Sequence, residues 1–326
     1  MNIETKYILA RKSQLHFYRD VPLYTKTDES KFVLYKPSGI TLGEMRIKEG
    51  LHPDSLFINS GDKLKGLQEA QKAFNQQLDG FIKSGNPEKV KETLVTIVEE
   101  TLMEPRSGSL EGVADTISIL ISDYSKEVDI IKQLIEISST DYSTVMHSIN
   151  VMAFALGFAL YHQFPHSDTK ILGLAALLHD VGKTKIPIDI LTAPRELTSE
   201  EFEIMKTHTT IGYQILSHCD FKDETICIVA RDHHERIDGS GYPNNEKDIS
   251  ITAQIIGLID CYEALTNDDR PYRNAMEIFP TLDQILKLEV MKGVFCPQIY
   301  TQFVKSLGTK QNNDAFRYSY NQRLSL

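Results

Sequence analysis

Apolar residues recur at intervals of three and four over most of the chain, which is the pattern of helices that bury one face. The pattern is first clear in a run that comprises Leu64, Leu67, Phe74, Leu78 and Phe81. It returns after Gly112 in a second run, made of Ile117, Leu120, Ile121, Tyr124, Val128, Ile131 and Ile135. We expect this second face either to dock on the helices that follow it or to pair with a second chain.

The first 63 residues have a different pattern. The strand-like runs KFVLY and SLFIN alternate there with turn signals, Pro37-Ser38-Gly39 and Ser60-Gly61-Asp62. This alternation predicts a small α/β or mainly β unit at the N-terminus.

Helix start signals divide the rest of the chain. Asn86-Pro87-Glu88 is a cap followed by proline at the first helical position. Thr198 and Glu201 have the spacing of a capping box, which predicts a helix that begins there and runs through His208.

The segment from residue 142 to residue 167 contains no Asp, Glu, Lys or Arg, as a membrane span would. However, it carries His147, Asn150 and His162, and its apolar centre from Val151 to Tyr161 is too short to cross a bilayer. We therefore expect a core helix and no membrane span.

Together these patterns predict a mainly α protein. We expect a small accessory domain over residues 1–63, a helical connector over 64–134, an all-helical bundle over 135–308 and a C-terminal tail over 309–326.

Composition narrows the class of protein. Apolar residues make up 41% and charged residues 25% of the chain, as in ordinary globular proteins. The net charge of −10 and pI near 5.5 argue against a nucleic-acid polymer as partner, so an anionic ligand would need locally placed cations. The four cysteines show no C-x-x-C spacing, and the N-terminus lacks the layout of a signal peptide. A cytoplasmic protein with reduced cysteines is expected.

Polar residues with metal-binding chemistry interrupt the apolar helices. The set comprises His147, His179, Asp180, His208, His233, His234 and Asp260. A single histidine on an apolar face is usually a hydrogen-bonded core residue, but this many imidazoles gathered without a counter-ion would suppress one another's protonation. Around divalent metals they form a ligand set, and mixed imidazole and carboxylate ligation suits iron, manganese, zinc or nickel.

The run LLHDVGK, residues 177–183, indicates that the metal site is catalytic. On a helix, His179 and Asp180 can approach a metal pair together, with Asp180 bridging both ions. Lys183 lies one turn later and can hold an anionic group beside the metals. A water bound between paired metal ions becomes a nucleophile near neutral pH, so Asp180 and Lys183 are the catalytic candidates.

Two further stretches add candidates for binding the substrate. HHERIDGSGYP, residues 233–243, presents Tyr242 on a glycine-rich turn, although Gly-Tyr-Pro alone would be a plain loop. NDDRPYR supplies Arg270 and Arg273, which fit either phosphate oxygens or surface salt bridges with nearby aspartates.

LLHDVGK, HHERIDGSGYP and EALTNDDRPYR together resemble the HD-GYP family of HD-domain phosphohydrolases, over about residues 135–308. The resemblance implies an all-helical domain that hydrolyses cyclic di-GMP to pGpG at a metal site formed by the seven residues above. It implies that Lys183 contacts the scissile phosphate, and that Tyr242, Arg270 and Arg273 hold the dinucleotide. Ser143 stands where three-metal members carry glutamate, which favours two ions, with iron as the first choice.

Two other functions stay open. One is a module with little turnover that binds a cyclic dinucleotide or a partner protein. The other is an HD phosphohydrolase that acts on another nucleotide. The N-terminal unit resembles accessory modules of some relatives, and a protein partner or a homodimer through this unit or the connector is a further expectation.

Overall fold

The computed structural model describes residues 6–27, 31–45, 52–103, 109–124, 144–219, 221, 223–267 and 280–307. Several predictions fall outside the described residues, namely those for Val128, Ile131, Ile135, Ser143, Arg270, Arg273 and the C-terminal tail.

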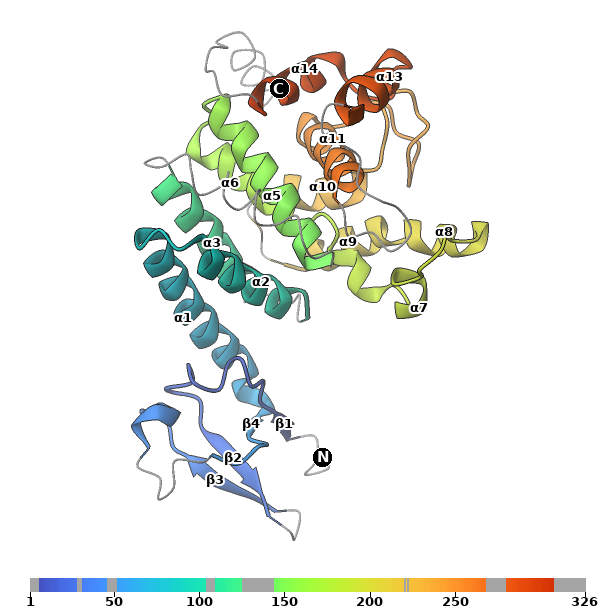
Figure 1. Ribbon diagram of the computed structural model, residues 1–326. Helices are drawn as coiled ribbons and strands as arrows, with labels where there is room; N and C mark the ends of the chain where they lie inside the picture. The colour runs from blue at the N-terminus through green and yellow to red at the C-terminus, as the bar shows by residue number, and fades with distance from the viewer. Residues whose placement is uncertain are drawn as a thin grey trace.

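A four-stranded antiparallel sheet forms the N-terminal part, at the lower end of the molecule in Figure 1. Its strands are β1 (Tyr7–Leu9), β2 (Leu23–Lys26), β3 (Phe32–Lys36) and β4 (Phe57–Asn59), in the order β1-β4-β2-β3. Short 3₁₀ helices lie at Leu42–Glu44 and Ser60–Asp62. The mainly β alternative is therefore confirmed; KFVLY covers all of β3 except Lys36, and SLFIN contains β4.

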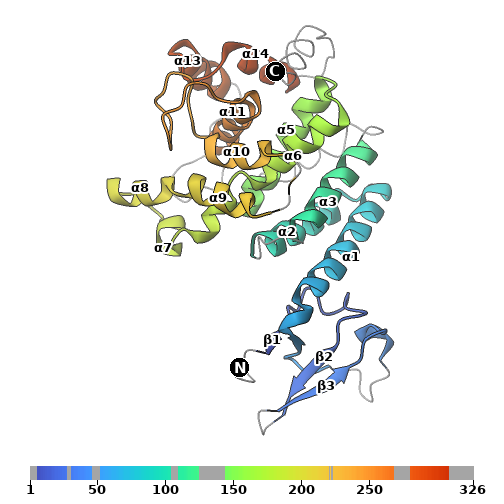
Figure 2. The same ribbon diagram turned by 180° about the vertical axis from the view of Figure 1, so that it is seen from behind.

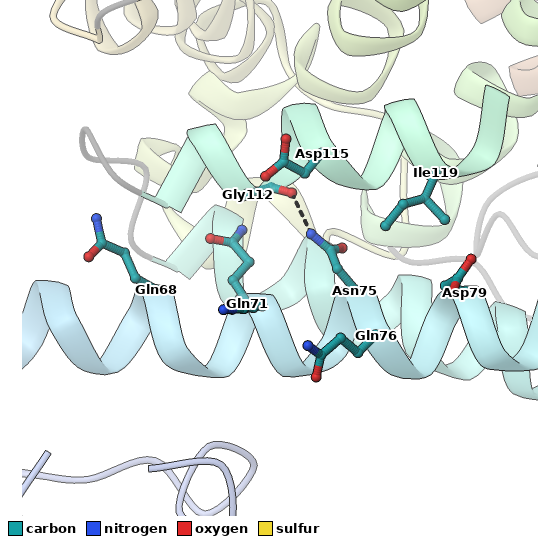
Figure 3. Close-up of a pocket in the computed structure, with 9 residues that line it drawn as sticks. Gln68, Gln71, Asn75, Gln76, Asp79, Gly112, Asp115 and Ile119 are labelled. Carbon is teal, nitrogen blue, oxygen red and sulfur yellow. Dashed lines mark hydrogen bonds between the residues drawn. The ribbon is translucent and has the colours of Figure 1, made fainter. Parts of the chain in front are cut away.

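Three helices connect this sheet to the rest of the chain: α1 (Lys63–Lys83), α2 (Pro87–Met103) and α3 (Ser109–Tyr124). They lie side by side in both views (Figures 1 and 2). Phe74 and Leu78 are buried as expected, but Leu64 is 47% exposed, because the first turn of α1 lies beyond the helices that cover the rest. A cleft of about 540 Å³ lies between α1 and α3, where Asn75 Nδ2 donates to the Gly112 carbonyl at 3.0 Å (Figure 3).

The apolar face of α3 docks within the chain, as far as the structure describes it. Ile117, Leu120 and Ile121 are buried. Ile117 packs where a side chain on Gly173 would otherwise lie, so α3 and the helix that carries Gly173 are in close contact. Of the two alternatives for this face, packing within the chain is the one found for these three residues.

The remaining helices form a bundle. They are α5 (Thr144–Tyr161), α6 (His166–Leu178), α7 (Ile188–Leu191), α8 (Ser199–Lys206), α9 (His208–Ser217), α10 (Thr225–Asp232), α11 (Ile251–Thr266), α13 (Lys287–Met291) and α14 (Pro297–Ser306), with a 3₁₀ helix at Val181–Lys185 and a π-helix at Thr281–Leu286. The helix α5 is long and apolar enough to span a membrane, but 67% of it is buried inside the protein. The expectation of a core helix is thus confirmed.

The capping box at Thr198 forms as predicted, but the helix that it opens does not run through His208. Thr198 Oγ1 accepts from the Glu201 backbone at 3.3 Å, and Glu201 Oε2 accepts from the Thr198 backbone at 2.9 Å. The helix ends at Lys206, where the Thr207 backbone nitrogen donates to the Ile204 carbonyl at 3.1 Å in a tight turn, and the Thr207 hydroxyl donates to the same carbonyl at 2.6 Å. A new helix, α9, then begins at His208.

Close backbone contact joins the end of α6 to the start of α9. A Cβ on Gly182 would lie 1.9 Å from the His208 carbonyl oxygen and 2.7 Å from the Gly212 nitrogen. Glycine at this position therefore lets the segment after α6 lie directly against α9.

We expect Gly182→Ala to push these segments apart and to lower the free energy of unfolding by about 1–3 kcal/mol or more. Gly157→Ala is the matched control, because no atom lies within 4 Å of its Cβ position in α5, and helical alanine should be stabilising by about 0.5–1 kcal/mol. The chain contains no tryptophan, so urea unfolding is best followed by circular dichroism. Equal stability of the two variants would contradict this account.

Candidate metal centre

Five segments that are distant in the sequence bring the seven predicted ligands together. His147 lies on α5, His179 follows the last residue of α6, and Asp180 precedes the 3₁₀ helix. His208 is the first residue of α9, the adjacent pair His233 and His234 follows α10, and Asp260 lies on α11. Figures 1 and 2 show these helices gathered in the same part of the bundle.

The side chains form overlapping groups of possible ligands. The three groups are Asp180, His208, His233 and His234; His147, His179 and Asp180; and His179, His233 and Asp260, and the ligand atoms within each lie within 4.8 Å of one another. All are buried except His234, whose side chain is 19% exposed. Asp180, His179 and His233 each belong to two of these groups, so the groups overlap into one cluster.

The two oxygens of Asp180 face different histidines. Oδ2 lies 3.4 Å from His147 Nε2 and 3.3 Å from His179 Nε2. Oδ1 lies 3.3 Å from His208 Nε2 and 3.8 Å from His233 Nε2. Asp180 is therefore at the centre of the cluster, with one pair of imidazoles on each side.

In three of the histidines, a hydrogen bond to a backbone carbonyl fixes which ring nitrogen carries the proton and which presents its lone pair to the cluster. His179 Nδ1 donates to the Ala176 carbonyl at 2.6 Å, and His208 Nδ1 donates to the Met205 carbonyl at 2.7 Å. His233 Nδ1 likewise donates to a carbonyl one turn earlier, at 3.1 Å. A carbonyl can only accept, so each Nδ1 carries the proton and each neutral ring presents the Nε2 lone pair to Asp180.

The inward Nε2 atoms of the cluster lie at short distances from one another. His208 Nε2 lies 3.4 Å from His233 Nε2, and His179 Nε2 lies 3.3 Å from His147 Nε2. Asp180 Oδ1 is buried with no hydrogen-bond partner among the described residues. Converging acceptors in a buried site repel unless a cation lies among them. The residues present thus fit divalent metal ions with imidazole and carboxylate ligands.

Glu263 orients His147 from behind. His147 Nδ1 donates to Glu263 Oε2 at 2.5 Å, while its Nε2 lies 3.0 Å from Asp260 Oδ1. Asn150 Nδ2 and Asn267 Nδ2 donate to Glu263 Oε1 at 2.8 and 2.7 Å. A carboxylate on the outer nitrogen of a histidine is a common support for metal ligation.

Charge in the cluster is strongly polarised. Burial lowers the pKa of His147, but the attraction of Glu263 and the hydrogen bonds to Asp260 and Glu263 outweigh it, so the pKa is raised well above its usual value. The position therefore stabilises positive charge. Burial raises the pKa of the Glu263 carboxyl, but the attraction of His147 and the hydrogen bonds that Glu263 accepts outweigh it, so this pKa lies below its usual value.

The imidazoles of His208, His233 and His234 are held neutral and the aspartates are held ionised. Burial lowers the pKa of His208 to about 4, and burial with neighbouring imidazoles holds the pKa of His233 and His234 well below the usual value. Burial raises the pKa of Asp180 and Asp260, but neighbouring groups outweigh it, so both pKa values lie well below the usual value. These groups are Lys183 and imidazoles for Asp180, and imidazoles alone for Asp260. Neutral imidazole and ionised carboxylate are the forms that bind metals.

Lys183 lies over Asp180, although the local geometry differs from the expected α-helix. Asp180 and Lys183 flank a turn of 3₁₀ helix, in which side chains three residues apart eclipse one another. Lys183 Nζ donates to Asp180 Oδ2 at 2.5 Å. The ammonium group is therefore held directly beside the ligand cluster.

Tyr242 lies against the cluster on the loop after α10. Its ring stacks on His234 with centroids 4.6 Å apart, and its backbone nitrogen donates to the His234 carbonyl at 3.2 Å. Glu235 is buried and accepts from the backbone nitrogens of Asn244 and Glu246 at 2.6 and 2.9 Å, which holds the loop in place. A Cβ on Gly241 would lie 2.4–2.5 Å from the backbone of residues 234–236, so glycine is needed there.

Sequence reasoning missed the supporting residues Glu263, Asn150 and Glu235. Glu263 had a signal, since it is a second carboxylate one turn after Asp260 in an otherwise apolar run. Arg270 and Arg273 lie outside the described residues, so their part in the site stays a prediction.

Comparison with known proteins gives one family match, to the family described as HD domain, over residues 127–290. The cyclic di-GMP phosphodiesterase PA4108 of Pseudomonas aeruginosa is 32% identical over 60% of this chain and 47% of its own length. A cyclic di-GMP phosphodiesterase of Thermotoga maritima is 40% identical over 44% of this chain and 38% of its own. The 3'3'-cGAMP-specific phosphodiesterase 1 of Vibrio cholerae is 34% identical over 42% and 32%. The chain thus spans about half the length, or less, of these curated relatives.

A solved structure shares the fold over nearly the whole chain. This is Bd1817, described as an HDG"Y"P protein from Bdellovibrio bacteriovorus, with a TM-score of 0.60 and 20% sequence identity. The match covers 92% of this chain and 99% of that one. The similarity therefore includes the N-terminal part as well as the helical bundle.

We expect Glu263→Gln to weaken metal binding by about 10–100-fold, because the variant removes the negative charge that orients His147 and makes it a better ligand. The measurement is metal retention during titration with a competing chelator. Glu289→Gln, at a partly exposed carboxylate on α13, is the control. Unchanged retention in the Glu263 variant would show that this carboxylate does not support the site.

Proposed function

Because the chain belongs to the HD-domain family and carries the motifs of its HD-GYP branch, we propose that it is a metal-dependent phosphodiesterase that hydrolyses cyclic di-GMP to pGpG. The names of the Pseudomonas aeruginosa and Thermotoga maritima relatives support this substrate. The observation that carries the proposal is the convergence of imidazole lone pairs on both oxygens of Asp180, with an ammonium group beside them.

We propose that the site holds two divalent metal ions, with iron as the first choice and manganese, zinc or nickel as alternatives. The ligands would be His147, His179, Asp180, His208, His233, His234 and Asp260. When bound, such ions would supply Lewis acidity and activate water for attack on phosphorus.

The chain's own groups account for the rest of the proposed chemistry. Attack on a phosphodiester adds negative charge to the phosphate oxygens, and the ammonium of Lys183 is held where it can stabilise that charge. The buried walls of the cluster exclude bulk water, which strengthens this interaction. Tyr242, Arg270 and Arg273 would hold the dinucleotide, Tyr242 from its position against His234.

Two other functions can be separated by one product assay. Metal-loaded protein is incubated with cyclic di-GMP, and the products are resolved by chromatography. Conversion to pGpG supports the proposal, whereas saturable binding without conversion would identify a binding module. The match to the 3'3'-cGAMP-specific relative favours a panel that includes this dinucleotide, because its selective turnover would identify a hydrolase of another substrate.

We also propose that residues 1–63 form an accessory domain, that 64–134 connect it to a catalytic domain over 135–308, and that 309–326 form a tail. A protein partner or a second copy of the chain would bind through the accessory domain or the connector.

Asp180→Ala should lose both bound metal and turnover, because it removes the carboxylate that both imidazole pairs face. Elemental analysis and the product assay measure the two losses. Asp189→Ala, at an exposed acidic residue on α7, is the control. Normal turnover by a metal-free Asp180 variant would contradict the assignment.

Lys183→Met should keep its metal but lose rate, because the ammonium stabilises negative charge on the phosphate rather than binding the ions. A loss of about 100-fold in kcat is expected. Lys185→Met removes an exposed ammonium from the same 3₁₀ helix and should keep the wild-type rate. If both lysine variants had the same kcat, the role given to Lys183 would be wrong.

A further inference from the structure

A second cleft, with a volume of about 600 Å³, is bordered by Tyr242. Phe202 and Lys206 of α8, Thr207 and Thr210 at the start of α9, and Tyr242 contribute to its wall. Tyr242 is shared between this cleft and the metal centre, because it also stacks on His234. The cleft is therefore separated from the ligand cluster by about one aromatic ring.

We propose that this cleft is a base subsite selective for guanine, in which Lys206 and Glu203 read the edge of the base. The inference rests on the proposed function and adds to it the residues that select the substrate. A cyclic dinucleotide whose phosphate lies at the metal centre must place its bases beside that centre, and this cleft is adjacent to it.

The aromatic side chains suit a flat ligand. The ring of Phe202 lies 6.3 Å from that of Tyr242, at an angle of 79°. Phe202 remains 45% exposed, although it is a large apolar side chain at the edge of a cleft. Exposed aromatic rings are the groups on which single bases stack in nucleotide-binding proteins, so a base would cover this surface.

Lys206 and Glu203 supply hydrogen-bonding groups that match guanine. Lys206 Nζ lies 5.0 Å from the centre of the Phe202 ring and 5.6 Å from that of Tyr242, and it donates to Glu203 Oε1 at 2.6 Å. The ammonium can donate to guanine O6 and N7. The carboxylate can accept from the N–H groups on the same base. Adenine carries an amino group where guanine has O6, so it would place a donor against the ammonium.

The same pair argues against a phosphate in this cleft. An ammonium that already contacts a carboxylate has most of its charge balanced, and the carboxylate repels a second anion. A neutral base is not repelled, and it can use both partners. Lys183 also contacts a carboxylate, but the proposed metal ions would offset the charge of Asp180, which leaves the Lys183 ammonium for the phosphate.

The test is binding of cyclic di-GMP and cyclic di-AMP to the full, metal-loaded chain by calorimetry. Wild-type protein should prefer cyclic di-GMP. Lys206→Met should weaken cyclic di-GMP binding by about tenfold or more and leave cyclic di-AMP binding nearly unchanged, because only guanine offers two acceptors to the ammonium. Lys206→Gln should shift the preference toward adenine, since an amide pairs with adenine N6 and N7.

Two variants control for fold and charge. Lys292→Met removes another lysine that pairs with a glutamate three residues earlier, on α13, and should bind both ligands as wild type does. Lys206→Arg should restore the preference for guanine, because its guanidinium also pairs with O6 and N7. A Lys206→Met variant that unfolded would fail to bind metal, which elemental analysis detects, and the Gln and Arg variants would then decide.

If Lys206→Met weakened the binding of both dinucleotides equally, the base subsite would be overturned and a phosphate contact indicated. Wild-type protein that bound both dinucleotides equally well would also overturn the subsite. The product assay is run in parallel on the same protein. Selective binding of cyclic di-GMP without hydrolysis would refute the proposed phosphodiesterase but support the subsite. Hydrolysis of cyclic di-GMP with unaltered selectivity in the Lys206 variants would support the proposed phosphodiesterase but refute the subsite.

Discussion

A buried carboxylate faced by imidazole lone pairs is the constraint on which the bundle's centre depends. Asp180 has one oxygen toward His147 and His179 and the other toward His208 and His233, at 3.3–3.8 Å. Such a cluster is unfavourable in a protein interior unless cations lie among its members. The need for cations thus explains why ligands from five helices converge, and why their outer nitrogens are already engaged.

The ends of helices supply acceptors for the outer nitrogens of these histidines. Three of the histidines sit at or just beyond helix ends, where carbonyls three or four residues earlier can accept from Nδ1. The 3₁₀ turn after α6 places Lys183 over Asp180, and the absence of a side chain at Gly182 allows that turn to lie against α9. His147 lies within α5, and its Nδ1 donates to the Glu263 carboxylate instead of to a backbone carbonyl.

The sequence was sufficient to predict which side chains converge in this cluster, because residues such as His147 and Asp260 interrupt apolar runs where a polar group is costly. It was not sufficient for Glu263 as a partner of His147, since that contact joins residues 116 positions apart and depends on how α5 packs on α11. The break at Thr207 is a single tight turn of the backbone, which the helical periodicity does not reveal. The strands β1 and β2 are three and four residues long, too short to show an alternating pattern.

The most direct test of the central claim is a calorimetric titration of chelator-treated protein with a divalent metal such as Mn²⁺, with the fold monitored by circular dichroism. The account predicts saturable binding of a pair of ions and a higher Tm in the loaded protein. A folded chain that bound no divalent ion, and whose Tm did not change, would contradict it.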